Sequence, residues 1–340
     1  MSIGIDKLAH MNTPALSDIL LAHSAAEGTG VIAIGDLPKL LNAGNLKMPD
    51  SEETIAEHYR QFCNRNLLIN WYFFKPVNQQ GLTAYQVRGY TIDMWRTWTA
   101  TTRVSLSKEG VLVDCTNADA DGIYQYFEDG ESLLVGKIVT ISVLTKEYGL
   151  INKSGILTSG SSSIIQTTEF GDIALFHSLA KTPPFFFRIS VNAGKAVTVI
   201  AAKLEFGSSQ TLAHREGSKW VLNEIPDYAL ELLKCQRYQF TSGGRESIYN
   251  LAIGTATSNK IVDFFLPLPT IMRTKAAVSF SNLYVSNSTI HHKVSRIENY
   301  GNVANGVWLH VTTEDSNLTT GQAYYLRTAN PFSFILDANL

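Results

Sequence analysis

Histidine and serine, which often act as metal ligands or nucleophiles, do not fall into a known catalytic motif in this sequence. His291 and His292 form the only histidine pair. Neighbours in a strand point to opposite faces, so these two cannot readily chelate one ion. The serine-rich run at residues 158–163 lacks the Gly-x-Ser-x-Gly spacing of a nucleophile elbow, and no glycine-rich phosphate loop occurs. We therefore expect no bound metal, no cofactor and no enzymatic activity.

Carboxylates form the second group that could do chemistry. Two acidic groups lie close together in the sequence: Asp114, Asp119 and Asp121, then Glu128, Asp129 and Glu131. A glycosidase needs two carboxyl groups about 5 to 10 Å apart. Both groups, however, fall in polar stretches that are typical of turns. Turn formation is the preferred interpretation, and a structural calcium ion is the lesser alternative.

Aromatic residues are the most informative candidates for binding. Sugar-binding sandwiches present exposed aromatic faces to the C–H bonds of a sugar ring, with polar groups holding the hydroxyls. Trp71 and Trp95 are expected in the core, because large aromatic residues are mostly buried. The candidate ligand-binding residues are four aromatics with polar neighbours: Trp98, Tyr124, Tyr126 and Trp308.

The elements that must position these residues are predicted from the period of the apolar residues. Within residues 1–65, Leu16, Ile19 and Leu20 recur at helical spacing, and further short helices are expected at 37–41 and 50–62. From residue 66 onward, short segments rich in β-branched and aromatic residues alternate with turn formers. Many short strands at this spacing indicate a sandwich or a barrel. We expect a mainly β fold, with a small helical N-terminal segment followed by two β-sandwich domains.

Length and turn signals predict the domain boundaries. The chain has 340 residues, more than the ~250 to 300 at which a single core stops growing. Pro226 and Asp227 precede a short helix that runs to Cys235, which is a natural joint between domains. We expect a helical attachment segment at residues 1–65, one β domain at 66–234 and a C-terminal β-sandwich at 235–340.

Charge and cysteine content restrict the partners. Lysine and arginine total 28 against 30 acidic residues, a net charge of −2, so no overall field attracts nucleic acid. The three cysteines are odd in number and far apart, which argues against a disulfide framework. No stretch reaches the ~18 to 20 apolar residues of a membrane span, and the N-terminus lacks a secretory signal. We expect neither nucleic-acid binding nor membrane insertion.

Several segments resemble a tail-associated module found in phages and prophages of gut Firmicutes. The opening of the module is matched by NLLINWYF at residues 66–73, VNQQG at 77–81 and GYTIDMW at 89–95. Later matches lie at residues 202–207, 210–213, 220–223 and 232–238. The resemblance covers residues 66–240 and extends loosely through 266–274, whereas the first 65 residues match nothing.

The resemblance implies a jelly-roll module similar to carbohydrate-binding modules, carried on a tail fibre or receptor-binding protein. Such a protein recognises host cell-surface polysaccharide without catalysis, and we expect it to be a homotrimer. Its N-terminal segment would attach to other tail proteins of the virion, which assembles in the host cytoplasm. The alternatives are a purely structural virion component, such as a collar, baseplate or head-decoration protein, and a glycan depolymerase. No family sugar contact can be carried over to a residue of this sequence.

Overall fold

The computed structural model describes residues 19–24, 28–33, 64–128, 130–181, 183–243, 250–287, 290–303 and 305–338. These residues are mainly β, which confirms the predicted fold class. The chain divides into two compact units, Met1–Cys63 and Asn64–Leu340, and each is described by itself.

The described part of the first unit is a β-hairpin. Strand β1 (Ile19–Ser24) pairs antiparallel with β2 (Gly28–Ala33). The helix predicted to include Ile19 and Leu20 is therefore wrong at these residues. A short apolar run fits a strand as well as a helix, and periodicity alone does not separate the two. The helices predicted at residues 37–41 and 50–62 lie outside the described residues.

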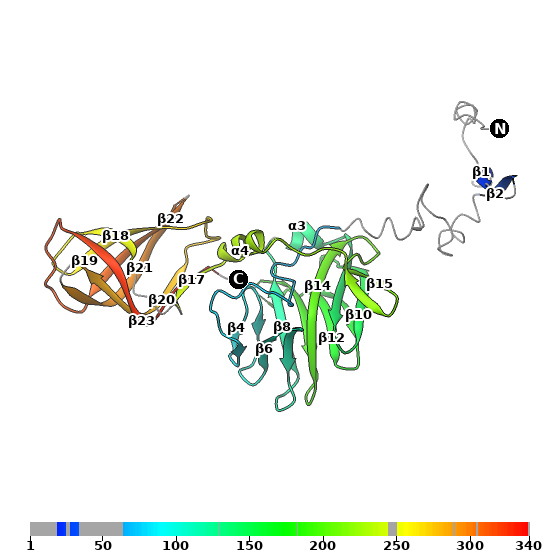
Figure 1. The fold of residues 1–340 in the computed structure, drawn as a ribbon, viewed down its shortest axis with the longest axis horizontal. Helices are drawn as coiled ribbons and strands as arrows, with labels where there is room; N and C mark the ends of the chain where they lie inside the picture. Colours follow the sequence, from blue (N-terminus) through cyan, green and yellow to red (C-terminus); the bar gives the residue numbers. More distant parts are fainter. Residues whose placement is uncertain are drawn as a thin grey trace, which may run out of the picture. The chain divides into compact units, whose positions relative to one another are not determined.

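The second unit begins with a sandwich of two six-stranded sheets (Figure 1). In spatial order, the first sheet consists of β10 (Gly149–Ile156), β9 (Ile138–Thr145), β14 (Ala196–Phe206), β7 (Gly110–Asp114), β6 (Arg103–Ser107) and β3 (Ala84–Tyr85). The second sheet consists of β11 (Ser162–Thr167), β12 (Gly171–His177), β13 (Phe185–Val191), β8 (Asp121–Tyr126), β5 (Arg96–Thr97) and β4 (Gly89–Tyr90). All of these neighbours pair antiparallel.

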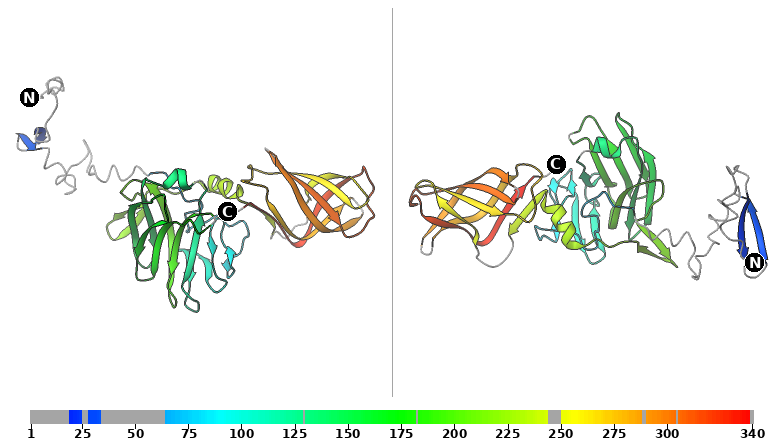
Figure 2. Two further views of the ribbon diagram at one scale, coloured as in Figure 1. Left: turned by 180° about the vertical axis from the view of Figure 1, so that it is seen from behind. Right: turned by 90° about the horizontal axis from the view of Figure 1, so that it is seen from above.

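The chain crosses repeatedly between the two sheets of the sandwich. It changes sheet six times: between β3 and β4, β5 and β6, β7 and β8, β8 and β9, β10 and β11, and β13 and β14. As a result, β14 lies between β7 and β9, and β13 lies between β8 and β12. Figure 2 shows this sandwich from two further directions. The inward side chains of both sheets form one core, in which Trp71 and Trp95 are both buried, as predicted.

Two short helices and a hairpin complete the sandwich. Helix α3 (Gly130–Leu134) follows β8, and β15 (Ala213–Glu216) pairs with β16 (Lys219–Leu222). Helix α4 (Tyr228–Gln236) begins after Asp227, whose carboxylate accepts a hydrogen bond from the backbone N–H of Ala229 at 2.8 Å. The sandwich core includes Cys235 and Tyr238, so it continues beyond residue 234, where the sequence analysis ends this domain.

The remaining strands form a closed barrel. They are β17 (Gln239–Gly243), β18 (Asn250–Ala256), β19 (Ile261–Pro267), β20 (Ala277–Ser286), β21 (His291–Val303), β22 (Gly306–Thr313) and β23 (Ala323–Asp337). The ladder runs β23-β18-β19-β22-β21-β20, and β20 then pairs again with β23. Strand β17 extends the pairing of β23. The interior of the barrel is a hydrophobic core distinct from that of the sandwich.

Closure of this ring differs from the second β-sandwich expected from the sequence at residues 235–340. Apolar residues alternate with polar ones along the strands of a sandwich and of a barrel alike, because in both folds one face of the sheet is buried. The pattern therefore predicts the strands but not the partner of the last one. The sheet closes into a barrel because β20 pairs with β23, and this pairing joins residues about fifty positions apart in the sequence.

Candidate functional site

The second sheet of the sandwich carries aromatic residues on the face turned away from the core. Ile123 of β8 is in the core, so Tyr124 and Tyr126 on either side of Gln125 point the other way. On β13, Phe185, Phe187 and Ile189 enter the core, whereas Phe186 and Arg188 share the face of the two tyrosines. The ladder places Tyr126 opposite Phe186, and Tyr124 opposite Arg188.

Trp98, which follows β5, lies over this face. Its ring stacks on Tyr124, with centroids 4.4 Å apart and an interplanar angle of 28°, and meets Phe186 edge to face at 5.6 Å. Tyr124 in turn lies 5.3 Å from Tyr126. Phe176 of β12 stacks on Phe186 at 4.9 Å. We call Trp98, Tyr124, Tyr126, Phe176 and Phe186 the outer-face cluster; it unites three of the four predicted ligand-binding residues.

Arg188 joins the aromatic rings to a carboxylate. Its guanidinium lies 5.4 Å from the ring centroid of Trp98 and 5.0 Å from that of Phe176, distances typical of cation–π contacts. The same guanidinium donates to both carboxylate oxygens of Asp172, at 3.1 and 3.3 Å. Ser190 also donates to Asp172, at 2.7 Å. This arrangement fixes charged donors and acceptors at the edge of the aromatic surface.

Arg96 supports the other side of the cluster. Its guanidinium lies 4.7 Å from the ring centroid of Tyr90, 5.9 Å from that of Tyr124 and 5.7 Å from that of Tyr126. Burial raises the pKa of Tyr124 to about 12, although the positive charge of Arg96 acts in the opposite direction. The phenol of Tyr124 therefore stays neutral to a higher pH than an ordinary tyrosine, whose pKa is about 10.

Exposure divides the cluster into a surface and its support. Tyr124 is only 3% exposed, so the prediction that it faces solvent is wrong. It is covered because Trp98 stacks on it and Arg96 lies close to its ring. Trp98, Tyr126 and Phe176 are partly exposed. These three side chains are the ones that a ligand could reach.

Trp308, the fourth predicted residue, lies outside this cluster. It belongs to β22 of the barrel and is 47% exposed. Its ring contacts Phe265, with centroids 5.4 Å apart. The four predicted residues thus belong to two separate aromatic surfaces, one on each β domain.

Sequence reasoning missed much of the support for the outer-face cluster, although a signal was present. In the run FFFRISV at residues 185–191, every second residue must face away from the core, which selects Phe186 and Arg188. The same rule applied to β12 selects Asp172 and Phe176. Arg96 carried no such signal, because β5 has only two residues.

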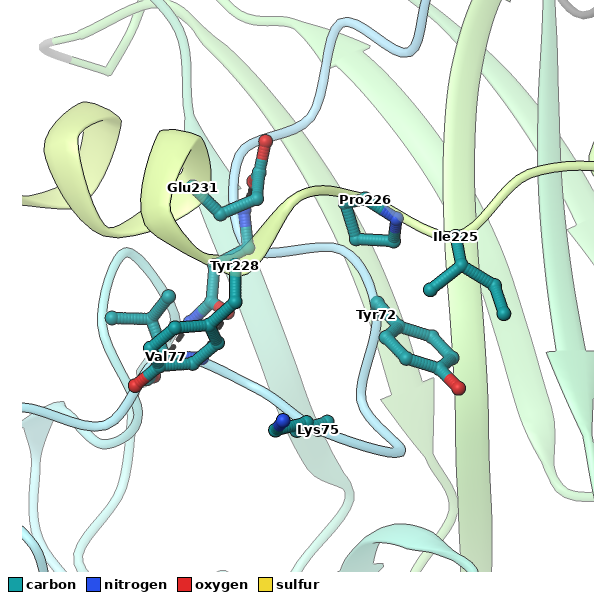
Figure 3. A pocket seen from close by; sticks show the side chains of 8 residues that line it. Tyr72, Lys75, Val77, Ile225, Pro226, Tyr228 and Glu231 are labelled. Carbon is teal, nitrogen blue, oxygen red and sulfur yellow. Dashed lines mark hydrogen bonds between the residues drawn. The ribbon is translucent and has the colours of Figure 1, made fainter.

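A cavity near the start of α4 was also missed. Its volume is about 270 Å³, and it is lined by Asn70, Tyr72, Lys75, Val77, Ile225, Pro226, Tyr228 and Glu231. Figure 3 shows the rings of Tyr72 and Tyr228 on opposite sides of it. The buried Glu231 carboxylate accepts a hydrogen bond from the backbone N–H of Asn70 at 2.7 Å. The lining comes from segments about 150 residues apart, so sequence spacing could not reveal it.

Histidine, cysteine and acidic side chains are the remaining groups with reactive or metal-binding chemistry. Among the described residues, no group of three or more His, Cys, Asp or Glu side chains could hold a metal ion. His291 is exposed and His292 is buried, as expected for neighbours in a strand. Burial raises the pKa of the thiols of Cys115 and Cys235.

No helix in the described part of the chain is long and apolar enough to cross a membrane. Comparison of the chain with models of protein families, with curated proteins and with solved structures found no match.

Proposed function

We propose that this chain is a non-catalytic glycan-binding protein and that the outer-face cluster is its saccharide site. The observation that carries the proposal is the partial exposure of Trp98, Tyr126 and Phe176 on one sheet face, beside the Arg188–Asp172 pair. Aromatic faces complement the C–H bonds of a sugar ring, and charged donors and acceptors complement its hydroxyls. The contacts among the rings and the two guanidinium groups hold this surface in place before a ligand arrives.

We also propose that the protein is a receptor-binding component of a phage tail that attaches the virion to host polysaccharide. The resemblance of residues 66–240 to a tail-associated module supports this role. Weak single sites suit such a protein, because a homotrimer multiplies modest affinities into firm attachment. Residues 1–65 would join it to other virion proteins. A mass in light scattering near the 37.5 kDa of one chain would contradict the trimer.

The saccharide site can be tested by measuring binding of the full chain to an array of bacterial cell-wall polysaccharides and teichoic acids. The informative variants are Trp98→Leu and Tyr126→Leu, which remove partly exposed rings. The control is Tyr148→Leu. Like the site residues, Tyr148 is a partly exposed aromatic residue, 37% exposed, and its ring centroid lies 5.2 Å from that of Phe170. We expect each site variant to weaken binding about tenfold, and the control to bind like the parent.

The same assay distinguishes the alternatives. Release of reducing sugar from a bound polysaccharide would favour a depolymerase. An intact parent protein that binds no glycan on the array, and no host cell, would favour a purely structural virion component. Equal binding by the parent and both site variants would place the saccharide site elsewhere on the protein.

The proposed attachment role of the N-terminus is tested by a deletion of residues 1–60. We expect the truncated protein to bind glycan like the parent but to be missing from assembled particles. Its incorporation at the parental level would refute that role.

A further inference from the structure

The outer wall of the barrel contains a cavity of about 340 Å³, lined by Asp263, Tyr300, Gly301, Trp308 and Leu309. These residues come from three neighbouring strands, β19, β21 and β22. The cavity is thus built on a continuous ladder of hydrogen bonds, and rigid elements of this kind hold a binding site more precisely than loops do.

A β-bulge presents one wall of the cavity. Asn299 pairs with Leu309 and Gly301 with Trp308, so Tyr300 is an extra residue between two paired positions. The buried Asn299 fixes the bulge: its amide donates to the carbonyl of Ala276 at 3.1 Å, and its side-chain oxygen accepts from the N–H of Gly301 at 2.9 Å. Bulges often re-aim a side chain next to a functional site. Here the result is a tyrosine that is 62% exposed.

Trp308 provides the second aromatic wall. Its neighbours Val307 and Leu309 are buried in the barrel core, so alternation turns the indole outward. Phe265 supports its ring from the adjacent strand. Gly306 makes room for this support, since a Cβ there would come within 2.7 Å of the Phe265 ring. The indole is therefore both exposed and held in place.

Asp263 supplies the polar group of the cavity. One carboxylate oxygen lies 2.6 Å from Nδ1 of His310, whose ring in turn stacks on Tyr300 at 4.6 Å and 8°. The side chain of Asp263 remains 40% exposed. A hydrogen-bond acceptor oriented by a histidine thus lines the same cavity as two exposed aromatic rings.

We propose that this cavity is a second saccharide site, separate from the outer-face cluster, and that it takes a neutral hexose. The apolar face of the sugar would lie on Trp308 and its edge against Tyr300, with hydroxyl groups donating to Asp263. The volume suits one sugar ring, and the carboxylate in the wall disfavours acidic sugars by repulsion. The ligand class rests on the proposed glycan-binding function, whereas the site itself rests on the geometry of the barrel.

The test uses the full chain labelled with 5-fluorotryptophan, which gives one fluorine NMR signal for each of its five tryptophans. Trp308→Phe and Trp98→Phe identify the two signals of interest. Galactose, glucose and N-acetylglucosamine are the neutral probes, each titrated to about 50 mM, because a single weak site has a Kd of about 1 to 10 mM. Glucuronate is the acidic probe. We expect at least one neutral sugar to shift the Trp308 signal saturably, and glucuronate to shift it much less.

Variants of the cavity provide the second part of the test. Tyr300→Ala and Asp263→Asn should each weaken the saturable shift about tenfold. Tyr325→Ala is the control, because Tyr325 is a 40% exposed tyrosine on β23 outside the cavity, and it should leave the shift unchanged. Unchanged signals of the other tryptophans show in the same spectra that each variant is folded.

The outcomes separate this inference from the proposed function. Absence of a saturable Trp308 shift with every neutral probe overturns the barrel site, and a shift of Trp98 alone does so while supporting the outer-face cluster. A shift of Trp308 alone supports the barrel site and speaks against saccharide binding at the outer-face cluster. Glucuronate affinity equal to that of the neutral probes overturns the assigned preference for neutral sugars.

Discussion

Lys203, in the long strand β14 of the sandwich, is fully buried, and its replacement by methionine should destabilise the protein. Its ammonium lies 3.1 Å from Glu224 and 3.8 Å from Glu205, whose side chain is also fully buried. At an effective dielectric constant of about 20, the attraction between two charges 3.8 Å apart is about 4 kcal/mol. Lys203→Met removes this attraction but leaves the Glu205 carboxylate buried.

The expected loss at neutral pH is about 3 to 5 kcal/mol of unfolding free energy, which is typical when one partner of a buried ion pair is removed. Glu205 keeps the hydrogen bonds that its carboxylate accepts from Thr211, one from the backbone N–H at 2.7 Å and one from the side-chain hydroxyl. These bonds lower the cost but do not neutralise the charge, so a substantial loss remains.

The loss should depend on pH in a defined direction. Burial raises the pKa of Glu205 above 4.5, and the charge of Lys203 opposes that rise. A raised carboxyl pKa means that ionisation of Glu205 costs stability above its folded pKa, and that this cost disappears as the pH falls toward 4.5. Lys203→Met raises the folded pKa further. The deficit relative to the parent should therefore be smaller at about pH 5 than at about pH 8.

Urea unfolding, followed by the fluorescence of the buried Trp71 and Trp95, measures the free energy of unfolding of the parent and the variant at each of the two pH values. The control is Lys153→Met, because Lys153 is an exposed lysine on strand β10 of the same sheet. It should change stability by less than about 0.5 kcal/mol. Equal deficits for Lys203→Met at the two pH values would refute the role given to Glu205, and absence of any deficit would refute the whole argument.

Three further variants test other parts of the sandwich. Gly122→Ala should lower the free energy of unfolding by about 2 to 3 kcal/mol in a urea melt, since its Cβ would lie 2.0 Å from the carbonyl oxygen of Ile189; unchanged stability would contradict this β8–β13 contact. Asn70→Ala should cost about 3 kcal/mol in the same assay, because its buried amide donates to the carbonyls of Val77 and Asp93 at 2.9 and 2.8 Å. Tyr124→Phe should remove a phenol that ionises at about pH 12 in an ultraviolet titration, and loss of one that ionises near 10 would contradict its burial. Because the pKa of Tyr124 is higher in the folded than in the unfolded state, its neutral phenol stabilises the fold. This stabilisation is complete below about pH 10 and is lost as the pH rises toward 12.

The strands were predictable because their local residue types agree with the fold. Residues 185–191 combine phenylalanine, isoleucine and valine between turn formers, and they form β13 with those bounds. Alternation within this strand also gives the direction of each side chain. The pair of strands at residues 19–24 and 28–33 was missed, since its apolar run has no period that separates strand from helix.

The candidate site was predictable in composition but not in geometry. Polar neighbours correctly indicated that Trp98, Tyr126 and Trp308 are not fully buried. They could not indicate that Trp98 covers Tyr124, because this contact joins residues of β8 and the loop after β5. Assignment of Trp308 to a separate surface likewise depends on pairing between distant strands, which residue types alone do not determine.

The β-bulge at Tyr300 is another feature that the sequence pattern does not predict. An inserted residue shifts the alternation of β21 by one position, so that a sequence pattern with a strict period of two assigns the following residues to the wrong face. Only the register of the neighbouring strand reveals where the extra residue lies.

The long strand β23 sets the order in which the two β domains can form during synthesis. All strands of the sandwich, and its last core residue Tyr238, precede the barrel strands in the sequence, so the sandwich can fold while the barrel is still being translated. The barrel cannot close until β23 has been made, because β17, β18 and β20 all pair with it. Until that moment β18 and β20 each have an unpaired edge, so a pause in translation before residue 323 would leave the nascent chain most exposed to aggregation.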